Sequence, residues 1–255
     1  MEVDVSGPVT TVPRLEERPP VAHGAGMTHR GLVRGQNEDS ILTDPSGTLW
    51  AVADGMGGYG HGDLASEMVI DQLEAVGDDG PAMESLVTVI TRANRAVYER
   101  ARADGFGQMG STVVAMMIQH AFAYIAWVGD SRAYLLRNGR LRMLTRDHTV
   151  VQIMVDRGEL TLAEAEGHPE SHIVTRAVGG DDDILVDTVS LPLLPGDRLM
   201  LCSDGLPRAV FEPVIESSLR ATSTPETACQ ALVREALDNG APDNVSVIVV
   251  DLIEG

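Results

Sequence analysis

Four aspartates lie where apolar segments begin or end, and their type and position suit them to bind cations. Asp54 follows the apolar segment 49–53, Asp130 follows "AWVG", Asp204 follows "LMLCS", and Asp243 comes just before "NVSVIVV". Each of them alone is most simply a turn residue, because Asp, Ser and Gly are common where strands end. Together they indicate a site, since strand ends at one edge of a sheet converge and clustered anions need cations.

The donor atoms predict which cation such a cluster would take. All the candidate ligands are oxygens, which favour Mg²⁺ or Mn²⁺, and their spacing does not match an EF-hand calcium loop. Gly55 directly after Asp54 leaves room for an ion to approach a backbone carbonyl. Cys202 lies on the same strand face as Asp204, but a small buried apolar residue is the better interpretation.

A second polar stretch, "THRGLVRGQNEDS" (28–40), contains Arg34, Glu38 and Asp39. Taken alone, this pattern is typical of an exposed surface. Beside a phosphate bound to two cations, however, the planar fork of Arg34 could grip two phosphate oxygens.

The overall composition excludes several classes of partner. The 255 residues carry a formal net charge of −19, which disfavours nucleic acid and anionic membranes, although an ordinary acidic surface explains this charge as well. Two cysteines form neither a disulfide framework nor a zinc motif, so a reducing, cytoplasmic setting is expected. The longest apolar run, "AFAYIAWV" (121–128), has the length of a strand and not of a membrane span, and we identify no signal peptide.

The elements that must position these residues follow from periodicity. Apolar residues recur at helical spacing over 65–76 and 86–97. A further helix is expected from Thr224, with Thr224 as N-cap and Pro225 at the first helical position. Asn138-Gly139 predicts a hairpin turn. Strands are expected at 111–119, 121–129, 131–137, 140–145, 183–190, 197–203 and 244–252. This order indicates an α+β layered domain and not alternating βαβ units.

The chain divides into an N-terminal extension and one domain. Residues 1–25 hold four prolines and no periodicity, which predicts a disordered extension. Residues 26–255 are expected to form a single domain. Within it, the segment 147–175 mixes short apolar bursts with polar turns, and we expect it to be mobile.

Six motifs in order resemble the metal-dependent Ser/Thr protein phosphatases of type 2C, and the bacterial branch in particular. They are "RGLVRGQNEDS", "ADGMGGYGHGDLAS", "MGST", "WVGDSRAYLLRNG", "LCSDGL" and "APDNVSVIVV", within a likeness that covers about residues 27–253. The resemblance implies a four-layer α-β-β-α sandwich of two mainly antiparallel sheets flanked by helix pairs. It also implies that 147–175 is the flap beside the active site.

The resemblance further implies a role for each polar residue. Asp54 would bridge two Mn²⁺ or Mg²⁺ ions, the Gly55 carbonyl would bind one of them, and Asp204 and Asp243 would bind the other. Asp130 would help to hold a third, weaker ion. For the residues of the second stretch, Glu38 and Asp39 would bind metal-bound waters, and Arg34 would hold the phosphate.

One departure from the family concerns the proton donor for the leaving group. Eukaryotic relatives carry a histidine where this chain has Met56, so protonation must come from elsewhere. His168 in "GHPE" and a water on the third metal are both candidates. For His168, as for His61 and His148, a surface or structural role is the simpler interpretation.

The function implied is hydrolysis of phosphoserine and phosphothreonine in proteins, opposing a Ser/Thr kinase. Two rivals remain open at this stage. A binding module or pseudophosphatase would be expected to lack one of Asp54, Asp204 and Asp243, all of which are present. A different two-metal hydrolase, such as a phosphodiesterase or nuclease, is disfavoured by the acidic charge and the lack of a basic groove.

Overall fold

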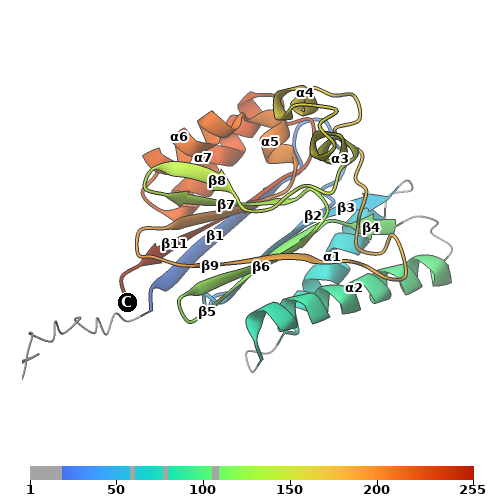
Figure 1. Ribbon diagram of the computed structural model, residues 1–255, viewed down its shortest axis with the longest axis horizontal. Helices are drawn as coiled ribbons and strands as arrows, with labels where there is room; N and C mark the ends of the chain where they lie inside the picture. Colours follow the sequence, from blue (N-terminus) through green and yellow to red (C-terminus); the bar gives the residue numbers. More distant parts are fainter. Residues whose placement is uncertain (1–18, 58–60, 77–79, 105–108) are drawn as a thin grey trace, which may run out of the picture.

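The computed structural model describes residues 19–57, 61–76, 80–104 and 109–255, and in it two antiparallel sheets pack face to face between helices (Figure 1). The first sheet runs in the order β1 (Val21–His29), β11 (Val245–Ile253), β10 (Arg198–Cys202), β7 (Arg132–Arg137) and β8 (Arg140–Met143). The second runs β2 (Asp39–Thr43), β3 (Leu49–Gly57), β5 (Val113–Gln119), β6 (Phe122–Val128) and β9 (Asp187–Pro192), and β4 (Met109–Ser111) pairs with β3. The expected α+β sandwich is confirmed.

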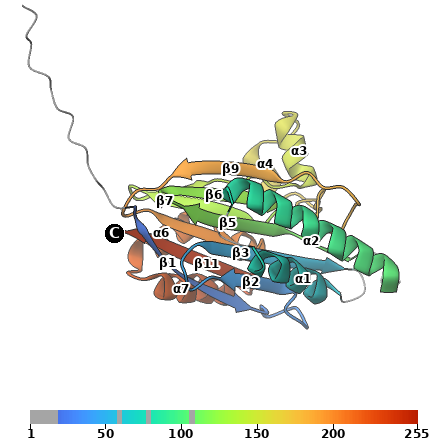
Figure 2. The ribbon, with the colours of Figure 1, turned by 90° about the horizontal axis from the view of Figure 1, so that it is seen from below.

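Helices cover the outer face of each sheet. The helices α1 (Gly62–Glu74) and α2 (Ala82–Asp104) lie over the second sheet (Figure 2). The helix α7 (Pro225–Asp238) packs on β1 and β11, beside α6 (Glu212–Ala221). The short helices α3 (Val150–Asp156) and α4 (Leu162–Glu166) stand out from the sandwich in both views, and α5 (Gly205–Ala209) directly follows β10.

Strand residues alternate between two apolar layers because successive side chains point to opposite faces. In β3, Ala51 and Ala53 pack under the helices, whereas Trp50 and Val52 pack between the sheets. The strand β11 divides its residues between layers in the same way. Both faces of these strands are buried, and for this reason the sequence shows continuous apolar runs and not simple alternation.

Several predicted elements are confirmed. The predicted apolar faces of α1 and α2 are buried or packed against the core. Thr224 caps α7, with its Oγ1 accepting from the Thr227 backbone N–H at 3.3 Å, and Pro225 follows at the helix start. Asn138 and Gly139 have positive φ at the tip of the β7–β8 hairpin.

The expectation of disorder up to residue 25 is wrong from Val21 onward, where β1 begins and pairs with β11 along its whole length. Glycines stand in this strand where it packs closely against the other sheet, so it lacks the run of β-branched residues that usually marks a strand. A Cβ on Gly24 would lie 2.5 Å from the Trp50 Nε1, and one on Gly26 would lie 2.8 Å from the Thr43 Cγ2. Residues 1–18 of the expected extension lie outside the described ranges.

Two further differences concern the second half of the chain. The strand expected from residue 183 begins only at Asp187, because residues 181–183 form bends whose carbonyls at Asp181 and Asp182 accept hydrogen bonds from the Asn94 side chain. The short helices α5 and α6 were not predicted. Among the described helices, none combines the length and apolar character needed to cross a lipid bilayer.

Candidate metal centre

Strands of both sheets bring carboxylates to one edge of the sandwich. Asp39 at the start of β2 lies directly opposite Asp54 in β3. Asp204 follows β10, and Asp243 precedes its neighbour β11. The pKa of Asp54 is raised well above its ordinary value, first by burial and then by the charges of Asp39, Asp204, Asp130 and Asp243. Asp39 thus lies beside Asp54, and Asp130, Asp204 and Asp243 all lie within ion-pair distance of one arginine, Arg208, so these aspartates lie near one another at this edge.

Asp39 is held at the seam between the sheets. Its Oδ2 accepts hydrogen bonds from the hydroxyls of Ser203 at 2.8 Å and Ser246 at 2.7 Å. Burial outweighs these two bonds and, with the charges of Asp204 and Asp243, raises the pKa of Asp39 to about 7. Its other oxygen, Oδ1, is buried without a hydrogen-bond partner.

Glycines make the close approach of β3 and α1 possible. A Cβ on Gly55 would lie 1.8 Å from the Gly62 carbonyl oxygen and 2.8 Å from that of Glu38. The Gly55 N–H donates to the Glu38 carbonyl at 2.9 Å. A Cβ on Gly62 would in turn lie 2.8 Å from the Glu38 Oε1. Only glycine therefore fits directly after Asp54 in β3. Residues 58–60 of the glycine-rich turn lie outside the described ranges.

Asn244 fixes the loop that carries Arg34 and Glu38. Its Nδ2 donates to the carbonyls of Arg30 and Gln36, both at 2.9 Å, and its Oδ1 accepts from the Glu38 N–H at 2.8 Å. All polar atoms of this 5% exposed side chain are therefore satisfied by one loop. The loop is positioned by a residue that directly follows Asp243 in the sequence.

Two arginines converge on Asp243. The Arg34 Nε and Nη2 contact its two carboxylate oxygens, each at 2.8 Å. The Arg208 Nη1 donates to the same Oδ2 at 3.1 Å, and Arg208 also forms an ion pair with Asp204. The sequence predicted Arg34 for a phosphate, and the structure has its fork on a carboxylate, which presents two oxygens in a similar way.

Asp130 lies at the turn between β6 and β7 and is 4% exposed. The preceding Gly129 has φ +104°, and a Cβ there would lie 2.5 Å from the Thr112 Cβ. The Gly129 N–H donates to the Nδ1 of His148, whose ring stacks on Trp127. Burial, followed by the charges of Asp204 and Asp147, raises the pKa of Asp130 well above its ordinary value. The turn therefore holds Asp130 in a fixed, desolvated position.

The donor atoms of this cluster fit divalent cations. Asp204 Oδ1, like Asp39 Oδ1, is buried without a hydrogen-bond partner. Burial is the main cause that raises the pKa of Asp204, against the opposing effect of Arg208. Oxygens of this kind are satisfied by a proton or a hard cation. Within the described ranges, no group of three or more His, Cys, Asp or Glu side chains is arranged so that it could hold a metal ion as it stands, and Arg34 and Arg208 contribute the neighbouring positive charge.

Other predicted residues lie apart from this cluster. The described hydrogen bonds of His168 are local, with its Nδ1 accepting from the Glu170 N–H at 3.2 Å. Cys202 is fully buried in the layer under α7, and burial raises its pKa to about 12, so its interpretation as an apolar residue is confirmed. Sequence reasoning missed Ser203, Asn244 and Arg208. The first two stand inside the recognised motifs, and the signal for Arg208 was its position four residues after Asp204.

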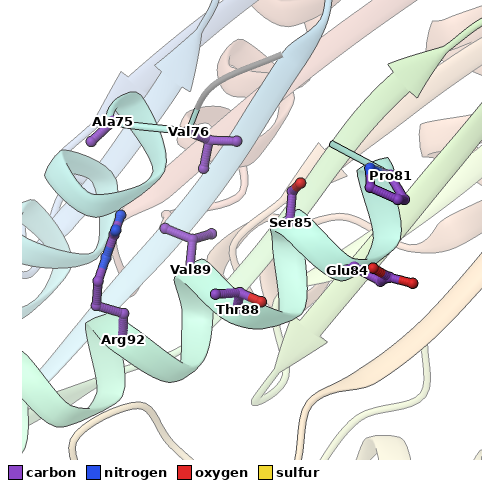
Figure 3. Close-up of a pocket in the computed structure, with 8 residues that line it drawn as sticks. All are labelled: Ala75, Val76, Pro81, Glu84, Ser85, Thr88, Val89 and Arg92. Carbon is purple, nitrogen blue, oxygen red and sulfur yellow. The ribbon is translucent and has the colours of Figure 1, made fainter. Parts of the chain in front are cut away.

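Two surface hollows lie away from this cluster. One of about 340 Å³ lies between the end of α1 and the start of α2, where Arg92 and Glu84 line it with small apolar residues (Figure 3). A second, of about 650 Å³, continues along α2 to Arg102 and Asp183. Neither is lined by a residue of the carboxylate cluster, so the site is identified by its charges and donor atoms and not by a deep cavity.

Comparison with known proteins agrees with this geometry. The family model described as "Protein phosphatase 2C" matches residues 26–153. The serine/threonine protein phosphatase PstP of Mycobacterium tuberculosis (strain ATCC 25618 / H37Rv) is 37% identical over 235 residues, which cover 90% of this chain and 45% of PstP. The chain thus spans about half the length of that relative. The serine/threonine phosphatase stp of Listeria monocytogenes serotype 4b (strain F2365) is 35% identical, with 90% of this chain and 95% of that protein covered.

Solved structures show the same fold. The catalytic domain of the serine threonine protein phosphatase PstP, in complex with two manganese ions, is similar with a TM-score of 0.84 and 34% identity, covering 92% of this chain and 99% of that one. The two ions are a property of that neighbour. The fold, the carboxylate cluster and these likenesses over most of the chain agree, and the chain belongs to the protein phosphatase 2C family.

Proposed function

We propose that this chain hydrolyses phosphoserine and phosphothreonine esters of proteins by means of a water molecule activated by two divalent cations, Mn²⁺ or Mg²⁺. The buried carboxylate cluster carries the proposal, because Asp39 Oδ1 and Asp204 Oδ1 have no hydrogen-bond partner. Such oxygens are unfavourable in a folded protein unless a cation or a proton satisfies them. Membership of the protein phosphatase 2C family supports the same chemistry.

The core ligands would be Asp54, which would bridge the two ions, the Gly55 carbonyl on one ion, and Asp204 and Asp243 on the other. Ions bound in this way lower the pKa of coordinated water and neutralise charge on phosphoryl oxygens. Asp54 is suited to a bridging position because it lies among the other carboxylates and is half-buried. The glycine packing around Gly55 leaves its carbonyl free of side-chain bulk.

The outer residues would orient water and substrate. Glu38 and Asp39 would accept hydrogen bonds from metal-bound waters, and Asp39 is already positioned for this by its two serine hydroxyls. Arg34 would bind two phosphoryl oxygens; its side chain is 52% exposed, so a substrate can reach it. No covalent enzyme intermediate is required, and the only cysteines, Cys202 and Cys229, are buried.

Proton transfer to the leaving serine or threonine oxygen has two candidate sources. Asp130 would help to hold a third, weaker cation and its water. His168 of the flap, about residues 147–175, is the alternative donor. We further propose that the chain from the start of β1 at Val21 to residue 255, and not only from residue 26, forms a single catalytic domain. Its physiological partners would be phosphorylated proteins and the kinase that modifies them. A comparison of phosphoproteomes with and without this protein would identify those targets.

The direct test compares three substrates with purified protein: a phosphoserine peptide, an aryl phosphate and a phosphodiester, each with Mn²⁺ and with a chelator. We expect Mn²⁺-dependent hydrolysis of both monoesters and none of the diester. Asp54→Asn should abolish it, whereas Asp238→Asn, an exposed carboxylate on α7, should not change it. Hydrolysis in metal-free buffer would refute the mechanism. Hydrolysis of the diester would favour a phosphodiesterase. A chain that folds but hydrolyses none of the three substrates would favour a binding module.

A further inference from the structure

Arg208, in the short surface helix α5, contacts several carboxylates at once. It lies on α5, one turn after Asp204, and forms an ion pair with the Asp204 Oδ2. Its Nη1 donates to the Asp243 Oδ2 at 3.1 Å, and its Nη2 lies 3.9 Å from the Asp130 Oδ2. One guanidinium therefore contacts three carboxylates that come from separate parts of the chain.

Among the described residues, every other arginine that forms an ion pair does so with a single carboxylate. Arg132 pairs with Asp147, and Arg198 pairs with Asp251, in contacts that join a strand to its neighbouring loop or strand. These two guanidiniums lie at sites of structural packing. Arg208 instead lies among carboxylates that the proposed function assigns to metal ions, and its side chain is 33% exposed.

We propose that Arg208 is an internal counter-ion of the carboxylate cluster, which neutralises Asp204 and Asp243 in the metal-free chain and competes with divalent cations for them. This inference rests on the proposed function, because it takes these two residues as metal ligands. It adds a residue that sets the affinity for the metal without being a ligand itself.

The geometry gives the reason for competition. Asp204 presents Oδ1 without a partner, while Arg208 holds Oδ2 of the same carboxylate. If a divalent cation bound Oδ1 while Arg208 stayed on Oδ2, two positive charges would be separated only by the width of one carboxylate. Such charges repel each other strongly where water is excluded. The exposed, flexible side chain gives Arg208 a path outward to solvent when the ion binds.

Arg208 also explains how a cluster of buried carboxylates is tolerated without metal. Its guanidinium lies within ion-pair distance of Asp130, Asp204 and Asp243 and so offsets part of the repulsion among the three carboxylates. Arg34, by contrast, forms its ion pair with Asp243 alone. Removal of Arg208 should therefore destabilise the metal-free chain and at the same time strengthen metal binding.

The experiment removes the positive charge of Arg208 and keeps a polar side chain at this position. Arg208→Gln is compared with wild type by calorimetric titration with Mn²⁺ and by thermal unfolding in chelator. We expect the dissociation constant for Mn²⁺ to fall by roughly threefold or more and the unfolding temperature in chelator to fall, with both differences smaller at high salt. Arg208→Lys, which keeps the charge, should stay close to wild type.

Arg220→Gln is the matched control, because Arg220 is an exposed arginine on α6 that pairs with Glu216 four residues before it. It should change neither measurement. If Arg208→Gln does not fold in chelator, it is refolded with Mn²⁺, and the comparison is the Mn²⁺ concentration that gives half of the maximal thermal stabilisation.

Weaker or unchanged Mn²⁺ binding in Arg208→Gln would overturn the inference, since it would mean that the arginine positions the ligands or has no influence on them. This result would leave the proposed function intact as long as wild type binds Mn²⁺. A wild-type chain that binds no Mn²⁺ would overturn both.

Discussion

Asp39→Asn should stabilise the metal-free protein at neutral and alkaline pH, although it removes a residue of the candidate site. The side chain is 6% exposed, and burial raises its pKa from 3.8 to about 7. Between these values the folded chain holds a proton that the unfolded chain has lost. The free energy of unfolding of the metal-free protein should therefore fall as pH rises from about 4 to about 7.

The interval between the two pKa values sets an upper limit of about 4 kcal/mol at pH 8. Asparagine has no such titration, and its Oδ1 can still accept from Ser203 and Ser246. Its amide nitrogen would take the place of the buried Asp39 Oδ1, which has no hydrogen-bond partner, and a buried donor without an acceptor costs about 1–3 kcal/mol. We therefore expect a net gain of about 2 kcal/mol at pH 8, or roughly 4–8 °C in unfolding temperature for a chain of this size.

The assay is thermal and urea unfolding of wild type and Asp39→Asn in chelator, from pH 4 to pH 8. The gain should vanish as pH falls toward 4, because the difference in protonation of Asp39 between the folded and unfolded states shrinks as pH approaches 3.8, and Mn²⁺ should stabilise wild type more than the variant. Asp44→Asn provides a control of opposite sign. Burial would raise the pKa of Asp44, but hydrogen bonds from Ser46 and Thr48 outweigh it and lower the pKa to about 2. Its replacement should thus cost up to about 1 kcal/mol at pH 7 after allowance for solvent screening. A stability difference between wild type and Asp39→Asn that does not depend on pH would refute the reasoning.

Three further predictions test the proposed roles. Arg34→Ala should raise KM for phosphopeptides by about tenfold, because a bidentate contact to phosphate is lost, without weakening Mn²⁺ binding; unchanged kinetics would make Arg34 a surface residue. Asp130→Ala should fold and bind two Mn²⁺ ions, yet lose turnover by about tenfold or more on phosphoserine and less on an aryl phosphate, whose leaving group needs no proton. Equal losses of kcat on the two substrates would mean that Asp130 plays no part in protonating the leaving group. Exchange of the flap, 147–175, for that of a relative should change preference among protein substrates far more than aryl phosphate hydrolysis, and equal losses on both would indicate a structural role.

Local sequence was sufficient for elements whose signals lie within a few residues. The periodic apolar faces of α1 and α2 were readable because side chains three and four apart share a helix face. The start of α7 was readable because Thr224 and Pro225 act on the first helical turn alone. The strand β1 was not, because its signal lies in the other sheet: Gly24 is required by Trp50, which is remote in sequence.

The sequence by itself determined that carboxylates end the strands, since a strand delivers the residue that follows it to the sheet edge. It also determined the family, since the motifs stand in order along the chain. Only the tertiary structure decided that Asp39 faces Asp54 and that Arg34 and Arg208 meet on Asp243, 209 and 35 residues away. Strand register, burial and the resulting pKa shifts depend on contacts between segments that are distant in sequence. For this reason they cannot be read from residue type and local spacing.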